Sequence, residues 1–364
     1  MDHPEPSFMA GTLTRLRPLT SLPPEIVGRV EVRVFVKVRD EAVRLPHFLA
    51  HYRRLGIHRF LIIDHESTDG TTALLGEQPD VHLFAAEGSF AAAGGGQAWL
   101  DELLDCYGAG HWCLTVDADE LLCFPGSETL GLPALCGMLD REGAEALPCL
   151  MLDMYGAAPL GALEYMAGES FLAACPWFDP GPYWRTNPNA ECPPQEIYGG
   201  VRQRVFYPQW QAPSRRLRLS ERCYDFANRL ASIRGNRTIQ SWRTKRPPNL
   251  AKVPLVRWRR GLRYLAVTHR ITPVRLSAGS GCLLHFKFLD NFGAKAAREA
   301  KRGEYFDGAR EYKRYAAVMA DAPTLTLWHE GSVRFEGSEQ LCRLGLMTPL
   351  PKLRAPAARE AASA

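Results

Sequence analysis

Short apolar segments alternate with amphipathic ones along the first third of the chain, and this alternation limits the folds that the chain can adopt. Four segments have the length and composition of buried strands: 30–38, 60–64, 81–84 and 112–116. Segments 45–55 and 97–106 have helical periodicity, and a turn at 67–72 leads into a further helix. Strands that alternate with helices form a mostly parallel sheet with helices on both faces. The sequence therefore predicts an α/β protein with a doubly wound, Rossmann-like sheet.

The chain divides into four predicted parts. Residues 1–29 are rich in proline and predict an extended lead-in, whereas residues 30–160 form the α/β half. Residues 161–320 form an irregular half that completes the domain, and residues 321–364 form a C-terminal extension and tail. Within the irregular half, a strand-like run and a helical run stand out, at 281–289 and 294–317. A chain of 364 residues has room for two domains or for one enlarged α/β domain.

The composition predicts a soluble cytosolic protein. Hydrophobic residues make up 46% of the chain and charged residues 23%, as in ordinary globular domains. No apolar run approaches the roughly 20 residues of a membrane span, and the first residues show no signal-peptide pattern. The 10 cysteines form no C-x-x-C pair, which favours reduced thiols packed in the core.

The run LTVDADE at 114–120 is apolar at its start and ends in three carboxylates. Ligands of open α/β sheets bind at the carboxyl ends of the strands, and this run delivers acids to that edge. Asp117 and Asp119 are one residue apart and can face one shared centre. A hard divalent cation, Mg2+ or Mn2+, suits such oxygen ligands and can also bind a diphosphate. The alternative is an acidic turn that caps the next helix.

Two other strand ends supply carboxylates to the same predicted edge. Asp64 ends the segment 60–64, and Glu41 lies just past the first strand. A carboxylate in this position can accept the imino proton of a uracil or the proton of a ribose hydroxyl. The turn at 67–72, which contains Asp69, offers hydroxyls and backbone N–H groups near a helix N-terminus. Simple capping of that helix is the alternative for the turn.

Basic residues are concentrated between Arg202 and Arg275, with seventeen arginines and two lysines against two acids. Such a segment attracts phosphates, anionic lipid head groups or nucleic acid, and a solvated arginine-rich surface is the alternative. Without a membrane span, any contact with the inner membrane would be peripheral and electrostatic.

Several longer motifs occur in a fixed order. In the first half they are VKVRDE, LPHFLAHYRRLG, IDHESTDGT and VDADE, at 36–41, 45–56, 63–71 and 116–120. In the second half they are MLDMY, YGGVR, KVPLVR and LHFKF, at 151–155, 198–202, 252–257 and 284–288. Together they resemble bacterial glycosyltransferases of the family 2 type, particularly the subgroup close to family 92, which have the GT-A fold. The resemblance covers about residues 30 to 315.

The resemblance implies roles for individual residues. Asp64 matches the acid that contacts the nucleotide base, and Glu41 matches an acid beside the nucleotide pocket. Asp117 and Asp119 match the D-x-D pair, of which the first faces ribose or a metal-bound water and the second the metal. His285 matches a late histidine that completes a Mn2+ or Mg2+ site. Further residues are assigned to the nucleotide-sugar pocket: Asp69 and Arg202.

The implied activity is transfer of a sugar from a nucleotide-diphosphate donor to a hydroxyl group, and the resemblance favours a UDP-sugar as the donor. The acceptor would be a glycan, a lipid-linked sugar or a polysaccharide of the cell envelope. Three acids in the irregular half are candidates for the base of an inverting reaction: Asp179, Glu191 and Glu196. Family members commonly have Asn-Glu at positions 40–41 and Asp-Asn-x-Ser at 64–67. The additional charge of Asp40 and Glu66 repels a diphosphate unless a cation offsets it.

Three other functions remain open. A nucleotidyltransferase would carry a glycine-rich, basic loop after the first strand, where this chain has Asp40 and Glu41. A haloacid-dehalogenase-like phosphatase would carry its nucleophilic aspartate at the first strand, whereas Asp117 follows the fourth. A non-catalytic protein that binds anionic ligands or nucleic acid would leave the aspartate pair unexplained. For the transferase, no nucleic-acid partner is expected.

Overall fold

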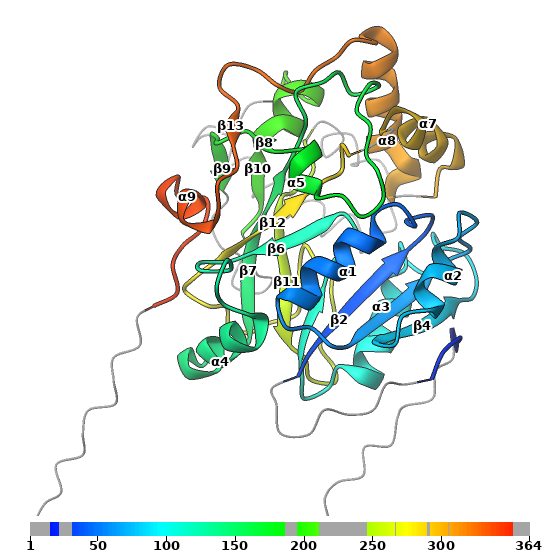
Figure 1. Ribbon diagram of the computed structural model, residues 1–364, viewed down its shortest axis with the longest axis vertical. Helices are drawn as coiled ribbons and strands as arrows, with labels where there is room; N and C mark the ends of the chain where they lie inside the picture. The colour runs from blue at the N-terminus through cyan, green and yellow to red at the C-terminus, as the bar shows by residue number, and fades with distance from the viewer. Residues whose placement is uncertain are drawn as a thin grey trace, which may run out of the picture.

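The computed structural model describes residues 15–21, 31–185, 195–210, 246–265, 267–289, 292–304 and 306–351. Within these residues the largest unit is a nine-stranded sheet with the order β1-β4-β3-β2-β5-β11-β7-β12-β6 (Figure 1). The strands are β1 (Leu16–Pro18), β2 (Val32–Val38), β3 (Phe60–Asp64), β4 (Val81–Ala86), β5 (Trp112–Thr115), β6 (Glu120–Cys123), β7 (Ala146–Asp153), β11 (Ala251–Arg257) and β12 (Gly281–His285).

Most strands of this sheet run in the same direction. β4, β3, β2 and β5 are parallel neighbours, and β7 and β12 form a second parallel pair. β11 lies between these groups and is antiparallel to both β5 and β7, so that the two groups share one direction. β1 and β6 are antiparallel strands at the two ends of the sheet. The predicted α/β class with a mostly parallel sheet is confirmed.

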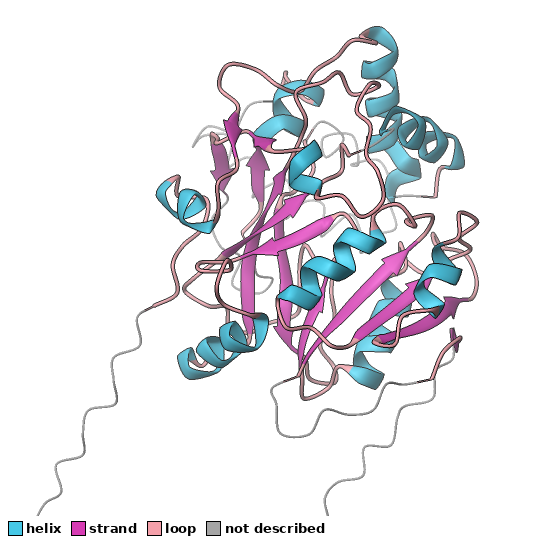
Figure 2. Ribbon diagram, in the orientation of Figure 1, coloured by secondary structure: helices cyan, strands magenta, loops and turns pink. Residues whose placement is uncertain are grey.

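Helices cover both faces of the sheet (Figure 2). α1 (Leu45–Arg54), α2 (Thr71–Gly76) and α4 (Leu132–Glu142) bury their apolar side chains in one core cluster. α3 (Gln97–Tyr107) packs in a second cluster, on the face that Phe35 and Ile63 present. The strand β2 supplies valines to the first cluster and Phe35 to the second, as expected from the alternation of side chains along a strand. The sheet is therefore doubly wound.

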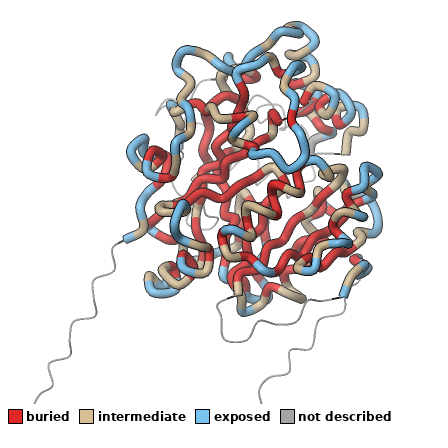
Figure 3. The backbone as a smooth tube through the Cα atoms, viewed as in Figure 1, coloured by how far each residue is buried: buried red, intermediate tan, exposed pale blue. Residues whose placement is uncertain are grey.

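The remaining elements surround the C-terminal half of the sheet. They are α5 (Phe171–Ala174), β8 (Trp177–Phe178), β9 (Tyr183–Arg185), β10 (Ile197–Gly199), a short π-helix η1 (Arg202–Phe206), α7 (Phe292–Arg302), α8 (Phe306–Asp321), β13 (Val333–Arg334) and α9 (Ser338–Arg343). α7, α8 and η1 enclose a third apolar cluster around Phe288 and Tyr315. Figure 3 shows that buried backbone is concentrated in the sheet and that exposed backbone lies in the peripheral loops.

Three features differ from the sequence-based expectation. Residues 16–18, inside the expected lead-in, form an edge strand that pairs with β4. The strand-like run at 281–289 is a strand only to His285, after which the chain turns. The helical run at 294–317 is interrupted near Gly303, whose φ of 70° lies in the left-handed region that ends helices. Helical periodicity continues across such a break and does not reveal it.

No helix within the described part of the chain is long and apolar enough to cross a membrane. The four expected sequence parts do not correspond to separate sheets. β11 and β12, from the irregular half, lie on either side of β7, from the α/β half. The two halves thus interleave in one sheet.

Two buried histidines of α1 predict that stability depends on pH. Burial, together with the charge of Arg54, lowers the pKa of His47 from 6.5 to about 4 and that of His51 to about 3. Below pH 6.5 the unfolded chain binds protons that the folded chain does not bind, so the free energy of unfolding falls as the pH drops toward 4. Each such histidine contributes a slope of at most about 1.4 kcal/mol per pH unit.

We expect His51→Gln to reduce this slope between pH 6.5 and pH 4, measured by urea denaturation at several pH values. His58, an exposed histidine close to the same helix, provides the control variant His58→Gln, which should keep the slope of the parent. Equal slopes for the parent and His51→Gln would contradict the assignment.

Candidate functional site

Charged side chains gather at the carboxyl ends of the parallel strands. β2, β3, β5, β7 and β12 all end at this edge because they share one direction. The residues at or just beyond these ends are Glu41, Asp64, Asp117, Asp153 and His285. In open α/β sheets this edge is where ligands bind, so we take it as the candidate site.

Asp119 and His285 face each other at this edge. β6 turns back directly after the acidic run and pairs with β12, so that Glu120 lies opposite His285 in the register. This pairing brings Oδ2 of Asp119 to 3.7 Å from Nε2 of His285. The other ring nitrogen, Nδ1, lies 2.6 Å from Oδ1 of Asp153. Because a carboxylate can only accept, Nδ1 carries a proton, and in the neutral ring Nε2 presents its lone pair toward Asp119.

Asp153 is itself held by a buried arginine. Nε of Arg202 donates to Oδ2 of Asp153 at 2.7 Å, and both side chains are almost fully buried. Nη1 of Arg202 lies 3.5 Å from Glu311 on α8. Burial raises the pKa of Asp153, but the charge of Arg202 and the hydrogen bond from His285 outweigh it and lower the pKa to about 2. Arg202, expected to touch the nucleotide-sugar, lies instead behind His285 and fixes its carboxylate partner.

Lys252 lies between the other two acids of the LTVDADE run and pairs with both. Its ammonium group donates to the fully buried Glu120 and lies 3.4 Å from Oδ2 of Asp117. The register of β11 shifts between Lys252 and Leu255, where Pro254 has no N–H to donate. Burial raises the pKa of Asp117, yet the charges of Lys252 and Lys37 outweigh it, so this pKa lies below its usual range. The side chain of Asp117 remains 45% exposed.

The acids after β2 and β3 are bound by their own loops. Oδ1 of Asp64 accepts from Ser67, and Oδ2 accepts from Thr72 at 2.9 Å. Asp69 accepts from the backbone N–H groups of Thr71 and Ala42, both at 3.0 Å. These bonds tie the loop after β3 to the loop after β2. Asp64 is only 6% exposed.

Glu41 pairs with two cations, and Asp40 accepts a hydrogen bond from the neighbouring loop. Glu41 lies 2.8 Å from Arg44 and 2.9 Å from Lys295. Asp40 has a φ of 52°, a left-handed conformation that suits Asn and Asp, and its carboxylate accepts from the backbone of Thr68 at 2.8 Å. The departure from Asn at position 40 therefore preserves the backbone conformation of this loop.

A divalent cation fits the donor pair formed by Asp119 and His285. Two ligands at about 2.1 Å from one ion lie at most about 4.2 Å apart, and Oδ2 and Nε2 are separated by 3.7 Å. One oxygen and one nitrogen donor suit Mn2+ or Mg2+ and leave coordination positions for phosphate oxygens. The described residues contain no cluster of three or more His, Cys, Asp or Glu side chains that could hold a metal ion, and Asp117 is paired with Lys252. The expected set of Asp117, Asp119 and His285 stays a prediction.

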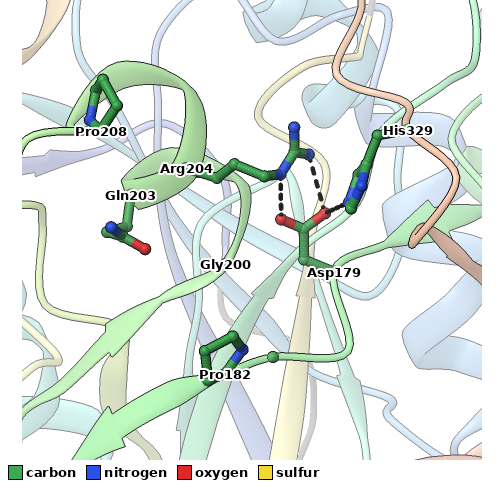
Figure 4. Close-up of a pocket in the computed structure, with 8 residues that line it drawn as sticks. Asp179, Pro182, Gly200, Gln203, Arg204, Pro208 and His329 are labelled. Atoms are coloured by element: carbon green, nitrogen blue, oxygen red, sulfur yellow. Dashed lines mark hydrogen bonds and ion pairs between the residues drawn. The ribbon is translucent and has the colours of Figure 1, made fainter.

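The described base candidates are both engaged by cationic partners. Asp179 is 4% exposed, and Nε and Nη2 of Arg204 donate to its two oxygens at 2.9 and 3.0 Å (Figure 4). Glu196 binds Arg270 and accepts from the hydroxyl of Tyr198 at 2.9 Å. Glu191 lies outside the described residues. Each described acid is therefore bound to a cationic partner. It could act as a base only if it shared or released that partner.

Part of the arginine-rich segment lies outside the described residues, at 211–245. Several of its described arginines form ion pairs with acids of the chain. The pairs are Arg257–Asp140, Arg263–Asp105, Arg270–Glu196 and Arg275–Glu145. These pairs reduce the charge that the described part of the segment offers to a membrane or to nucleic acid.

Sequence reasoning did not identify Asp153 and Lys252 as site residues. Asp153 ends an apolar run, as Asp64 and the LTVDADE acids do. The position of an acid at the end of an apolar run is therefore enough to identify Asp153 as a candidate site residue. Lys252 is a single charge within a seven-residue strand that is otherwise apolar up to Arg257. An isolated lysine in such a strand indicates a buried acid as its partner.

Comparisons with known proteins do not assign a family to the chain. No family model and no curated protein matches it. One similar solved structure is a 4-diphosphocytidyl-2C-methyl-D-erythritol synthase, with 16% identity and a TM-score of 0.24 over 37% of this chain and 67% of that chain. Another is described as a glucose-1-phosphate thymidylyltransferase from Bacillus anthracis, with 9% identity and a TM-score of 0.23 over 38% of this chain and 64% of that chain. Similarities of this size support no assignment of activity.

The burial of the Asp153–Arg202 pair predicts a large effect on stability. Arg202→Leu removes the main cationic partner of a buried carboxylate, which costs about 3–5 kcal/mol of unfolding free energy. Arg257→Leu breaks the exposed pair with Asp140, in which the side chains are 48% and 35% exposed, and should cost no more than about 1 kcal/mol. Chemical denaturation of both variants measures the difference. Equal losses would show that Arg202 is not an essential partner of Asp153.

Proposed function

We propose that the chain is a metal-dependent glycosyltransferase. It transfers a sugar from a nucleotide-diphosphate donor, a UDP-sugar by its family resemblance, to a hydroxyl of a glycan, lipid-linked or polysaccharide acceptor. The observation that carries this proposal is the pair of Asp119 and His285 at the ligand-binding edge, with Nδ1 of His285 fixed by Asp153. Five of the motifs that resemble the family 2 type contain or follow the strand ends at this edge, at 36–41, 63–71, 116–120, 151–155 and 284–288.

The residues at this edge have different roles in donor binding. Asp119 and His285 would hold the cation, which when bound neutralises charge as the nucleoside diphosphate leaves. Asp153 and Arg202 orient the imidazole and fix its tautomer. Asp117, which is half exposed, is available to accept from a ribose hydroxyl.

Cations of the chain reduce the repulsion that the acids of the site would exert on an anionic donor. Lys252 pairs with both Glu120 and Asp117, and Lys295 and Arg44 pair with Glu41. These pairs lower the negative charge that a diphosphate would meet. Glu66, one of the two additional acids, is paired with Arg39 at 3.1 Å.

The loop after β2 supports a glycosyltransferase over a nucleotidyltransferase. In the described loop, Asp40 and Glu41 bond to Thr68 and Thr71 of the neighbouring loop. A glycine-rich, basic loop that cradles a triphosphate would leave its N–H groups free for the ligand. Product analysis separates the two activities, because one releases a nucleoside diphosphate and the other releases pyrophosphate.

The first test concerns Asp119. We expect Asp119→Ala to lose Mn2+-dependent binding of UDP and slow hydrolysis of UDP-sugars. Its unfolding free energy should stay within about 1 kcal/mol of the parent, because the side chain keeps some exposure, at 15%, and its described ionic partner lies 3.7 Å away. Asp140→Ala, on α4, is the control and should bind as the parent does.

Isothermal titration with Mn2+ and a panel of nucleoside diphosphates measures the loss. Parent-like binding and hydrolysis by Asp119→Ala would remove the D-x-D assignment. A parent protein that neither binds nor hydrolyses any nucleotide-sugar would remove the proposed function.

The second test concerns the orientation of His285. Asp153→Asn keeps the size of the side chain but offers an amide to Nδ1 and removes the charge that holds the Nδ1 proton. We expect the affinity for Mn2+ to fall by about 10–100-fold, as is typical when the partner of a metal-binding histidine is changed. Titration of Mn2+ in the absence of donor measures this directly. An unchanged Mn2+ affinity in a folded Asp153→Asn variant would show that Asp153 serves stability alone.

A further inference from the structure

A second candidate site lies away from the acids of the sheet edge. A cavity of about 310 Å3 opens between η1, the loop after β8 and the loop that carries His329 (Figure 4). Its polar walls are Asp179, Gln203, Arg204 and His329, and its other walls are glycines and prolines. The volume is at the lower end of the roughly 300–1,000 Å3 found for small-molecule sites. The cavity therefore suits a small ligand better than a whole nucleotide-sugar.

Asp179 and Arg204 form a fixed and neutral part of the wall. The carboxylate accepts two bonds from Arg204 and one from the hydroxyl of Tyr155. Nη2 of Arg204 also donates to the backbone oxygen of Leu327 at 2.7 Å. Nη1 takes no part in the pair with Asp179, and the Arg204 side chain is 32% exposed. The charges of the two residues cancel.

His329 is held as a neutral ring. Its Nδ1 accepts from the backbone N–H of Gly331 at 3.2 Å, so the ring proton lies on Nε2. Nε2 lies 3.4 Å from Oδ1 of Asp179. Nδ1 as an acceptor carries no proton, and Nε2 is buried without a hydrogen-bond partner among the described residues. The polar wall as a whole carries no net charge.

The remaining polar group offers an acceptor. Nε2 of Gln203 donates to the backbone oxygen of Trp210 at 3.1 Å, and its amide oxygen points toward the side of the cavity that holds Asp179 (Figure 4). Trp328, the chain neighbour of His329, is 40% exposed and packs edge-on against Trp177. An exposed indole combines an apolar face with a polar N–H.

These features select the chemistry of the ligand. A phosphate or a carboxylate would need a net positive wall, and a nucleobase would need an aromatic face inside the cavity. A neutral ligand rich in hydroxyl groups needs neither, because each hydroxyl both donates and accepts. The amide oxygen of Gln203 provides an acceptor for such groups.

We infer that this cavity binds a neutral sugar ring of the acceptor. The inference rests on the proposed function for the identity of the acceptor, but the binding of sugar itself does not depend on it. Asp179 is then an anchor that fixes Arg204 and His329. The short helix η1 links this cavity to the sheet edge, since Arg202 binds Asp153 and Arg204 binds Asp179.

Saturation-transfer NMR on the full chain tests the inference, with neutral mono- and disaccharides of glucose, galactose, mannose and N-acetylglucosamine. Inorganic phosphate and UMP are the comparison ligands, added without a metal ion. We expect at least one neutral sugar to bind and to be displaced by neither comparison ligand. Gln203→Ala should weaken that sugar by about 5–10-fold, the effect of one lost hydrogen bond.

The matched control is Gln78→Ala, a half-buried glutamine that precedes β4 at the opposite edge of the sheet, and it should bind as the parent does. The inference is overturned if no neutral sugar binds, if phosphate competes with it, or if Gln203→Ala binds as the parent does.

Hydrolysis of nucleotide-sugars by the parent protein separates this inference from the proposed function. Hydrolysis without sugar binding removes the cavity assignment and leaves the transferase. Sugar binding without hydrolysis removes the transferase and leaves a sugar-binding cavity.

Discussion

The structure depends on the compensation of charge that is buried at the carboxyl edge of the sheet. Asp153 and Glu120 are almost without solvent contact, and an unpaired carboxylate in that environment would take up a proton or destabilise the fold. Each has a cation from a distant part of the chain, Arg202 for Asp153 and Lys252 for Glu120. The second half of the chain therefore supplies the cations that balance the buried acids of the first half.

This balance explains the interleaving of the sheet. β11 carries Lys252 and β12 carries His285, and these strands lie on either side of β7, which ends in Asp153. The antiparallel direction of β11 and the register shift near Pro254 place the lysine beside the acids that follow β5. A purely parallel insertion would bring only strand ends to this edge, whereas an antiparallel strand brings residues near its start. The order and direction of the strands therefore determine which charges meet at the site.

The sequence predicts those parts of the structure that local patterns determine. Strand β3 and the first residues of α1 and α3 agree with periodicity, and Asp64 and Asp117 lie at strand tips as expected. The pairs that hold the site are not local, since Lys252 and Glu120 are 132 residues apart and Arg202 and Asp153 are 49 apart. Nothing in a local pattern identifies the partner of a charge. The same limit explains β1, which becomes a strand only because β4 leaves an edge to pair with.

The helix η1 joins the two candidate sites through residues that are two positions apart. Residues at i and i+2 of a helix face different directions, so Arg202 binds Asp153 on one side and Arg204 binds Asp179 on the other. Both contacts are short and largely buried, and π-helical turns such as η1 are often found at functional sites. Movement of η1 would disturb both ion pairs together. The geometry of the cavity and the orientation of His285 therefore cannot vary independently, and under the proposed function this coupling would hold an acceptor in a fixed relation to the donor.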